Sequence, residues 1–516
     1  MRRRDVSISL LTSTVGSTLA VTGASAQASA PPSYGQTAQE ATAGVRPTNT
    51  SYPATPAWVR RYGASLDGKT DDTAALTTAL AVAGTKKPST VVIDGPMSIH
   101  SYVTIPPSVT IQFIADGALL PFAATIIRYL GLINAAPVHI FQANETAKGV
   151  GGGTVLVGGK QKAYCFEWWG AIGDGSTDDH VAISNCMAQV SAVQGTIELL
   201  GTYAIHQAIR MKPNVEIVGR GKDFGTGFNL VGEAQIVFDN TCFRAAIRRC
   251  TINLSRCSAP VGIQFGGGCY NLTLEDMFVY GLTRIATNLI GIALAHCQQI
   301  VLNRVTVYGN ERNSDTGIEV GTGSYGVEVI AADVEACNKG IAVIDAAQAD
   351  ILGVYAERNQ FAIYVKRSGS GACSIRGGVI AVPGAGVAIG LIPDLSDVSI
   401  DGVNITPHGA LGITSAGYTG AVSRVTIRNV PLAAIVDPDH CFHINSADGP
   451  FAGTATFASS ATVAVTFAVP APNTNYTVAL GGNPAGHVWS SGKTRTGFTL
   501  NCSAANSNST DWTVTL

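Results

Sequence analysis

The sequence predicts an all-β solenoid, in which short parallel strands stack along one axis, and three observations support this fold class. Similar segments recur roughly every 20–30 residues between positions 245 and 440, as in repeat architectures. The 516 residues include 58 glycines and 46% hydrophobic residues but only 13% charged ones, as expected for many short strands with one buried face. In addition, two related motifs each precede a strand-rich stretch.

Each repeat combines apolar strands with a polar turn. Stretches such as QQIVLNRVTVYGN, YGVEVIAADVEACN and QADILGVYAERN carry alternating Val, Ile and Leu, and a second apolar strand such as GIEV or GIAVI often follows. Parallel strands with a buried inner face produce such nearly continuous apolar runs. Asn310, Asn338 and Asn359 follow the strand in three successive repeats, so we expect an asparagine ladder that bonds its own turns and stacked neighbours.

The repeated motif reads RRYGASLDGKTDD from Arg60 and EWWGAIGDGSTDD from Glu167. In each copy an aromatic-Gly-Ala tripeptide leads to an Asp-Gly turn, because glycine tolerates positive φ. The Thr-Asp-Asp that follows predicts a helix start, where Thr or Asp accepts from free backbone N–H groups and the second Asp lies in the positive first turn. We interpret the acidic pair, Asp178 and Asp179 in the second copy, as caps rather than metal ligands or a catalytic pair.

The pattern GDGxTDDxxA after an aromatic-Gly-Ala resembles the opening of the pectate-lyase-like, right-handed parallel β-helix family, and the second copy is the closer match. That family includes polysaccharide lyases, glycoside hydrolases and bacteriophage tailspikes. The resemblance implies a right-handed single-stranded parallel β-helix whose open N-terminal end is covered by the helix after the motif. Two copies imply a small first β-module over 58–165 that leads into the main β-helix over 166–447.

The N-terminal residues have the parts of an export signal. Residues 1–28 combine a basic start, a weakly apolar middle and small-residue sites, and the Arg3-Arg4 pair resembles a twin-arginine signal. The alternative is a disordered leader rich in Ser, Thr and Ala. Residues 29–57 are predicted to be a linker. The eleven cysteines show no C-x-x-C pair and no zinc spacing, so we expect buried free thiols.

Residues 448–516 have a different pattern, with alternating strands separated by Gly, Asn, Pro and Ser turns. They resemble a small β-sandwich found at the C-terminus of many phage tail proteins and related bacterial β-helix proteins. A module of this size has a marginal core, so we expect it to trimerise by burying Val488, Trp489 and Trp512. The alternative is a monomeric carbohydrate-binding module with Trp489 as its sugar platform.

Candidate site residues gather at one corner of neighbouring repeats. No nucleophile elbow, phosphate-binding loop or His-based metal motif occurs, and we expect neither a metal nor a cofactor. Coils stacked about 4.8 Å apart bring carboxylates at such a corner to separations that suit glycoside hydrolysis. The candidate catalytic residues are Glu311, Asp315, Glu335 and Glu357, and the candidate substrate-binding residues are Arg312, Arg358, Tyr308 and Tyr355. The alternative is a set of solvated turns with local ion pairs.

The net charge of −2 provides no field that would attract nucleic acid or an anionic membrane.

Together with the resemblance, these features predict an extracellular, tailspike-like homotrimer that binds and depolymerises a bacterial surface or extracellular polysaccharide. One alternative is an exported bacterial polysaccharide lyase or hydrolase of the same fold. Another is a structural or adhesive β-helix without enzymatic activity.

Overall fold

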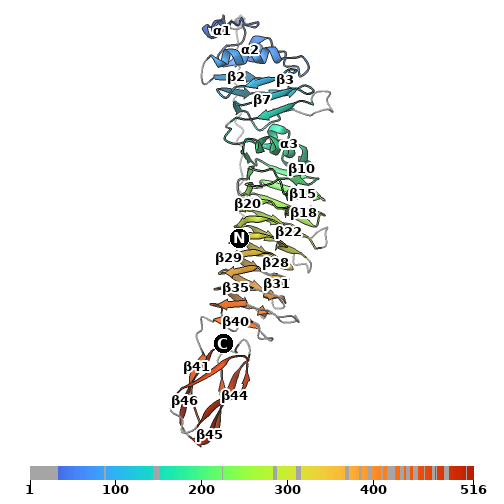
Figure 1. The fold of residues 1–516 in the computed structure, drawn as a ribbon. Coiled ribbons are helices and arrows are strands. Elements are labelled where there is room, and N and C mark those ends of the chain that lie inside the picture. The colour runs from blue at the N-terminus through green and yellow to red at the C-terminus, as the bar shows by residue number, and fades with distance from the viewer. Residues whose placement is uncertain are drawn as a thin grey trace, which may run out of the picture.

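The computed structural model describes most of the chain from residue 33 to residue 515, and Figure 1 shows an elongated rod. The described ranges are 33–85, 89–142, 152–159, 161–222, 225–282, 288–309, 315–366, 371–382, 386–392, 397–407, 411–414, 425–430, 435–436, 442–445, 451–457, 460–467, 471, 474–481, 487–506 and 508–515. The predicted export signal over 1–28 and Asn310 of the predicted ladder lie outside these ranges.

Three parallel sheets form the main body, and successive turns of the coil add one strand to each sheet (Figure 1). Sheet I contains β10 (Asp174–Asp178), β12 (Thr202–Ile205), β15 (Gly227–Gly232), β18 (Thr251–Cys257), β21 (Phe278–Tyr280), β24 (Thr306–Tyr308), β27 (Asp333–Glu335), β30 (Tyr355–Glu357), β33 (Val379–Val382) and β36 (Asn404–Pro407). Sheet II contains β11 (Thr196–Glu198), β14 (Glu216–Val218), β17 (Ala246–Arg248), β20 (Tyr270–Glu275), β23 (Gln298–Asn303), β26 (Tyr325–Ile330), β29 (Gln348–Leu352), β32 (Ala372–Arg376), β35 (Val398–Asp401), β38 (Val425–Arg428) and β40 (Phe442–Asn445). Sheet III contains β13 (Ile209–Arg210), β16 (Ile236–Phe238), β19 (Val261–Phe265), β22 (Ile290–Leu294), β25 (Thr316–Val320), β28 (Lys339–Ile344), β31 (Phe361–Lys366), β34 (Val387–Leu391), β37 (Leu411–Thr414) and β39 (Ile435–Val436). The predicted right-handed parallel β-helix is confirmed.

Alternation along each strand separates the core from the surface. In sheet I, Val307, Val334 and Ala356 stack in register on the inner side and are fully buried. The residues before and after each of them lie on the opposite face, because successive side chains of a strand alternate. The inner side chains form one hydrophobic core that extends from Ala57 to Ile435.

The first β-module is itself a short three-sided coil. Its strands are β1 (Ala57–Trp58), β2 (Ser89–Ile93), β5 (Val109–Phe113) and β8 (Leu132–Asn134) in one sheet, β3 (Pro96–Ile99) and β6 (Ala118–Pro121) in the second, and β4 (Val103–Ile105), β7 (Ile126–Tyr129) and β9 (Thr154–Val157) in the third. Helices α2 (Thr73–Gly84) and α3 (His180–Ser191) follow the two copies of the motif, after the 3-10 turns η1 (Val59–Tyr62) and η3 (Phe166–Trp169). The N–H groups of Ile140 and Phe141 donate to Trp168 O, so the module continues into the main coil without a break.

The two copies of the motif fold alike. In the second copy the Asp178 carboxylate accepts the His180 N–H at 3.1 Å, at the first residue of α3. The Asp179 carboxylate lies against the preceding turn, where it accepts the N–H groups of Ile172 at 2.7 Å and Gly173 at 3.1 Å. The first copy repeats these bonds, from Thr73 to Asp71 and from Ser65 and Leu66 to Asp72.

These contacts confirm a cap at the first aspartate and correct the prediction for the second. Asp179 occupies the N-cap position, but its side chain makes no cap hydrogen bond to α3. It is buried, and it satisfies two backbone donors of the turn that would otherwise lack a partner. The acidic pair therefore fastens the motif's turn to its helix.

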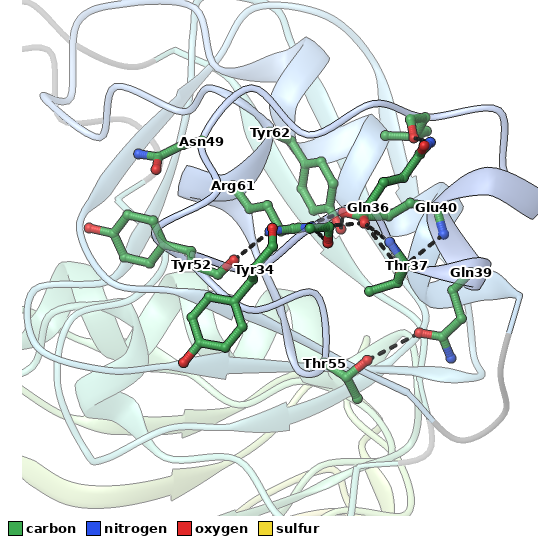
Figure 2. A network of polar contacts seen from close by, with 12 residues as sticks. Tyr34, Gln36, Thr37, Gln39, Glu40, Asn49, Tyr52, Thr55, Arg61 and Tyr62 are labelled. Carbon is green, nitrogen blue, oxygen red and sulfur yellow. Dashed lines mark hydrogen bonds and ion pairs between the residues drawn. The ribbon is translucent and has the colours of Figure 1, made fainter. Parts of the chain in front are cut away.

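The segment 29–57 was predicted to be a linker, and its described part, 33–57, instead packs on the first module. Helix α1 (Ala38–Thr42) begins with a capping box between Thr37 and Glu40. Arg61 is fully buried and gives two hydrogen bonds to Glu40, at 2.5 and 2.8 Å. Figure 2 shows the two side chains and the contacts around them. The other three donors of Arg61 bind the carbonyls of Tyr34, Gly35 and Tyr52. The linker prediction was wrong because it rested on composition, whereas one fully satisfied arginine orders the segment.

Asn359 links neighbouring coils, but the register of β27 and β30 aligns it with Cys337 and not with Asn338, so the predicted stacking of these two asparagines is wrong. It is fully buried, its Oδ1 accepts the Cys337 N–H at 2.9 Å, and its Nδ2 donates to Val334 O at 2.8 Å. Both partners belong to the preceding coil, so one side chain links two coils. All cysteines among the described residues are buried and carry free thiols.

The C-terminal segment forms two three-stranded antiparallel sheets. One contains β41 (Phe451–Thr456), β46 (Ser509–Thr515) and β43 (Thr477–Gly481), and the other β42 (Ser460–Thr466), β45 (Gly497–Asn506) and β44 (Val488–Thr494). Val488 and Trp512 pack against the core of this sandwich, whereas Trp489 is exposed and its ring lies 5.8 Å from that of His487. Of the three residues predicted to be buried by trimerisation, Trp489 is thus the one with its side chain largely free of the core. In the part of the chain described, no helix has the length and hydropathy needed to cross a bilayer.

Candidate functional site

The predicted corner lies on the outer face of sheet I, where β24, β27 and β30 of three successive coils are neighbours. The register places Tyr308 beside Glu335, and Glu335 beside Glu357, in a line parallel to the rod axis. Asp333 and Tyr355 form a second line on the same face, two residues earlier on their strands. These five positions share one surface because each strand alternates inward and outward side chains.

Hydrogen bonds connect the predicted residues. Arg358 donates through Nη2 to Glu335 Oε2 and to the Tyr308 hydroxyl, both at 3.0 Å, and its guanidinium lies 5.6 Å from the centre of the Tyr308 ring. The Tyr355 hydroxyl donates to Glu357 Oε2 at 2.7 Å. The structure therefore brings together five of the eight predicted site residues: Tyr308, Glu335, Tyr355, Glu357 and Arg358.

Asp333 belongs to the same cluster, although the sequence prediction did not select it. It lies two residues before Glu335 on β27, and this spacing puts both side chains on one face of a strand. Its Oδ1 is buried and accepts no hydrogen bond from any described residue. Thr306, its neighbour on β24, accepts a bond from Lys222 Nζ at 3.3 Å. The i, i+2 spacing of two carboxylates in a strand was the available signal.

Asp333 has an unusual affinity for its proton. Burial, and next the negative charge of Glu335, raise the pKa of Asp333 to about 6, while Lys222 acts in the opposite direction. A carboxyl group with this pKa stays protonated under mildly acidic conditions, when an ordinary aspartic acid has lost its proton. It is therefore suited to donate a proton to a leaving group.

The strand positions of Asp333 and Glu357 are offset in a way that suits a pair of catalytic carboxyl groups. They lie on adjacent coils and two residues apart along the strand direction. With a rise of about 3.3 Å per residue and a strand spacing of about 4.8 Å, the two backbone positions are roughly 8 Å apart. Inverting glycosidases hold their two carboxyl groups about 6.5–9.5 Å apart, which leaves room for a water molecule.

The remaining predicted residues are not part of this surface as described. Asp315 is 1% exposed, next to the buried thiol of Cys337, so it does not lie on the outer face with the others. Glu311 and Arg312 lie outside the described residues. Among the residues that are described, no group of three or more His, Cys, Asp and Glu side chains could hold a metal ion.

Aromatic rings extend the surface toward the N-terminus. Tyr280 lies in register with Tyr308, one coil nearer the N-terminus. The Tyr280 ring stacks with that of Phe278, with 5.1 Å between the ring centres. Together with the exposed rings of Tyr308 and Tyr355, they border the carboxylates along the rod axis. Sugar rings present apolar C–H faces that pack on such aromatic side chains.

A second group of charged residues, on sheet II, forms a series of ion pairs between neighbouring coils. Arg248 pairs with Glu216 at 2.9 Å and with Glu275, and Arg304 pairs with Glu275 at 2.8 Å and Asp276 at 2.6 Å. Each charge thus has a partner on a neighbouring coil. Exposed pairs of this kind contribute little individually, about 0–1 kcal/mol.

No family model matches this chain, and no curated protein does. Several solved structures resemble it. ORF18 of Geobacillus virus E2 aligns over 68% of this chain and 76% of its own, at 15% identity and a TM-score of 0.39. The A-module of the mannuronan C-5 epimerase AlgE6 from Azotobacter vinelandii covers 55% of this chain and 79% of its own, at 18% identity and a TM-score of 0.38. The tailspike protein gp49 from Pseudomonas phage LKA1 covers 89% of this chain and 99% of its own, at 15% identity and a TM-score of 0.32.

The fold of this chain is established by its own three parallel sheets. The chemistry of the sheet I surface depends on this chain's own residues, above all on Asp333, Glu335 and Glu357.

Proposed function

We propose that this protein binds a bacterial surface or extracellular polysaccharide along sheet I and hydrolyses it. The observation that carries the proposal is the pair of carboxyl groups on adjacent coils, Asp333 with a raised pKa and Glu357 with its hydrogen bond from Tyr355, between aromatic rings. Two carboxyl groups with different proton affinities are what glycoside hydrolysis requires.

In the proposed reaction Asp333 is the general acid and Glu357 the general base. The Asp333 carboxyl gives its proton to the glycosidic oxygen as the bond from that oxygen to the anomeric carbon breaks. Glu357 accepts a proton from the water whose oxygen forms the new bond to that carbon. Tyr355 orients the Glu357 carboxylate by donating to Oε2. Glu335 is a positioning residue, because its charge helps to keep Asp333 protonated.

The charges of this surface favour hydrolysis of a neutral polymer over elimination from a uronate. A lyase needs cations to neutralise the charge that develops at the uronate. On the described sheet I face, Arg358 is bonded to Glu335 and Tyr308, and Lys222 to Thr306. With Asp333 protonated as the general acid, the carboxylates of Glu335 and Glu357 offset the charges of these two cations, and both cations already have partners. A uronate chain would therefore meet no excess of positive charge among these residues.

We further propose that the protein acts outside a bacterial cell, as an exported enzyme or as part of a virion tail. The export-type leader over 1–28 supports the first setting. The sandwich over 448–516, which resembles those of phage tail proteins, supports the second, and with it a homotrimer.

The products of incubation with purified polysaccharides test the proposal. We expect new reducing ends from a neutral bacterial polysaccharide, without the ultraviolet absorbance of unsaturated uronates. Absorbance from a uronate polymer would instead show a lyase. Binding without any new reducing end would show an adhesive protein, and both results would refute the hydrolase assignment.

A further inference from the structure

A second set of exposed tyrosines lies on sheet II, around the corner from the carboxylates. Phe243, Tyr270, Gln298 and Tyr325 lie in register on four successive coils. Tyr270 and Tyr325 are 40% and 55% exposed, and the Tyr270 ring stacks on that of Phe243 at 5.5 Å. Since adjacent coils are about 4.8 Å apart, the two tyrosines are separated by about 10 Å along the axis.

A line of polar residues in an unusual conformation runs beside these rings. Four residues of this line have φ between 51° and 59°, and they occupy equivalent positions on successive coils: Asn214, Arg244, Asn271 and Gln299. Gly326 continues the line with a φ of 65°. Left-handed conformations are rare for residues other than glycine, so their recurrence at one position of successive coils is a distinct feature of this edge. The side chains of Asn271 and Gln299 are exposed there.

A groove of about 420 Å³ lies along the second line and includes Tyr325 of the first. Tyr270 is the residue directly before Asn271, which contributes to the lining. Asn271, Thr273, Gln299, Tyr325 and Glu328 contribute to its lining, and Glu328 is the one charged residue in it. Amide and hydroxyl groups can exchange hydrogen bonds with sugar hydroxyls, and the tyrosine rings offer faces for stacking. A groove with so little charge fits a neutral polymer better than an anionic one.

We propose that this sheet II groove is a second, non-catalytic binding site for a neutral polysaccharide chain, which lies along the rod axis. Tyr270 and Tyr325 stack on sugar rings two coils apart, and Asn271, Gln299 and Glu328 bond the hydroxyl groups. Glu328 is the single carboxylate of the lining, and Asp350, its neighbour on the next coil, is paired with Arg376 at 3.4 Å. Without a free pair of carboxyl groups, this surface holds the polymer and does not cleave it. The inference rests on the proposed function, since it assumes that the protein recognises polysaccharide.

Affinity electrophoresis of the full chain tests this site separately from catalysis. The native gels contain dextran or galactomannan as neutral probes, or alginate as an anionic one, and all proteins carry Glu357→Gln so that the gel is not degraded. We expect a neutral probe to retard the parent, and the double variant Tyr270→Ala, Tyr325→Ala to need at least tenfold more polymer for the same retardation. Tyr102→Ala, which removes an exposed tyrosine of the first module, serves as the matched control and should behave as the parent.

Several outcomes would overturn the inference: equal retardation of double variant and parent, retardation by neither neutral probe, or stronger retardation by alginate. Light scattering tests whether a second copy of the chain occupies the groove instead of a polysaccharide. A double variant that dissociates would show that the groove contacts such a copy. Cleavage is measured in parallel without Glu357→Gln. A protein that releases no reducing ends, yet loses binding in the double variant, refutes the proposed hydrolysis and leaves the second site standing.

Discussion

Glu335 contacts no reacting bond in the proposed mechanism, yet its charge sets when Asp333 loses its proton. Replacing it in Glu335→Gln removes the negative charge and with it the ion pair between Glu335 and Arg358. Both changes favour the ionised form of Asp333, so its pKa falls below about 6. We expect the alkaline limb of the pH profile of kcat/KM, which reports the loss of the acid's proton, to move to lower pH.

Asp350→Asn is the matched control for that profile. Asp350 is an outward carboxylate on β29 of sheet II, where it pairs with Arg376 at 3.4 Å. Its replacement should leave the limb in place. A limb that stays fixed or rises in Glu335→Gln would disprove the role assigned to this glutamate.

Asp179 provides a second test at the scale of single residues. Asp179→Ala leaves two backbone N–H groups of the turn without their acceptor, which costs about 1–3 kcal/mol of unfolding free energy. Asp178→Ala removes a cap and costs about 0.5–2 kcal/mol. Urea unfolding measures both losses, and polysaccharide cleavage should persist well below the melting temperature. If cleavage disappeared while melting stayed unchanged, the aspartates would be catalytic.

The sequence could identify part of the sheet I cluster and not the rest. Tyr308, Glu335 and Glu357 were accessible because a strand followed by a polar corner recurs at a fixed period, and stacked coils bring equal positions together. Asp333 was missed because its importance comes from burial and from the charge beside it, which no spacing reveals. Asp315 was selected by its place near the corner, but the chain turns its side chain into the interior there.

At the scale of elements, the N-terminal helix α1 depends on the contact between Arg61 and Glu40. Arg61→Met should remove about 3–5 kcal/mol from the local stability of residues 33–57, because the carboxylate of Glu40 stays buried without its partner. The main coil should remain folded, since its core does not include this ion pair. Hydrogen exchange of 33–57 measures the local opening.

The neighbouring residue Arg60 provides the matched control for Arg61→Met. It pairs with Asp94 at 2.8 Å in a partly exposed setting, so Arg60→Met should cost only about 0–1 kcal/mol. Equal exchange rates in the two variants would show that burial of Arg61 confers no special stability.

The same contact should make this element sensitive to acid. Burial alone would raise the pKa of Glu40, but the hydrogen bonds from Arg61 and Thr37 outweigh it and lower the pKa from 4.5 to about 2. A lowered folded-state pKa stabilises fully above the ordinary value, and the contribution fades as the pH falls from about 4.5 to 2. Protection of 33–57 from exchange should therefore decline within this window. Protection that stays constant down to pH 2 would contradict the assignment.

Elements were predictable where a period or a motif defines them. The coils, the two capping helices and the C-terminal strands all follow from patterns of this kind. Residues 33–57 have a composition rich in Pro, Thr, Gly and Ala that resembles a linker. What orders them is one long-range contact between residues 21 positions apart, and composition holds no information about such a contact.

At the scale of the whole molecule, one core continues from the first module through the main coil, and the sandwich has a separate, small one. We therefore expect removal of the chain from Gly453 onward to leave the β-helix folded. If the sandwich trimerises the protein, the shortened chain should be monomeric and bind polysaccharide more weakly. Light scattering decides this, and a full-length species at the 53.2 kDa chain mass would exclude the trimer.

Processing of the N-terminus bears on where the protein acts. If residues 1–28 are an export signal, protein recovered from a periplasm or culture medium should begin near Ser29. N-terminal sequencing of that material is the measurement. Secreted or virion-assembled protein that retains Met1 would refute the signal.

The central claim, that sheet I cleaves polysaccharide with Asp333 and Glu357, is tested most directly by the rate of reducing-end release in three matched variants. Asp333→Asn and Glu357→Gln should each lose a factor of about 10²–10⁴, as expected for general acid or base catalysis. Asp350→Asn, on the sheet II strand β29 that directly precedes β30, should keep the parent rate. Comparable rates in all three folded variants would contradict the assignment of the reaction to this surface.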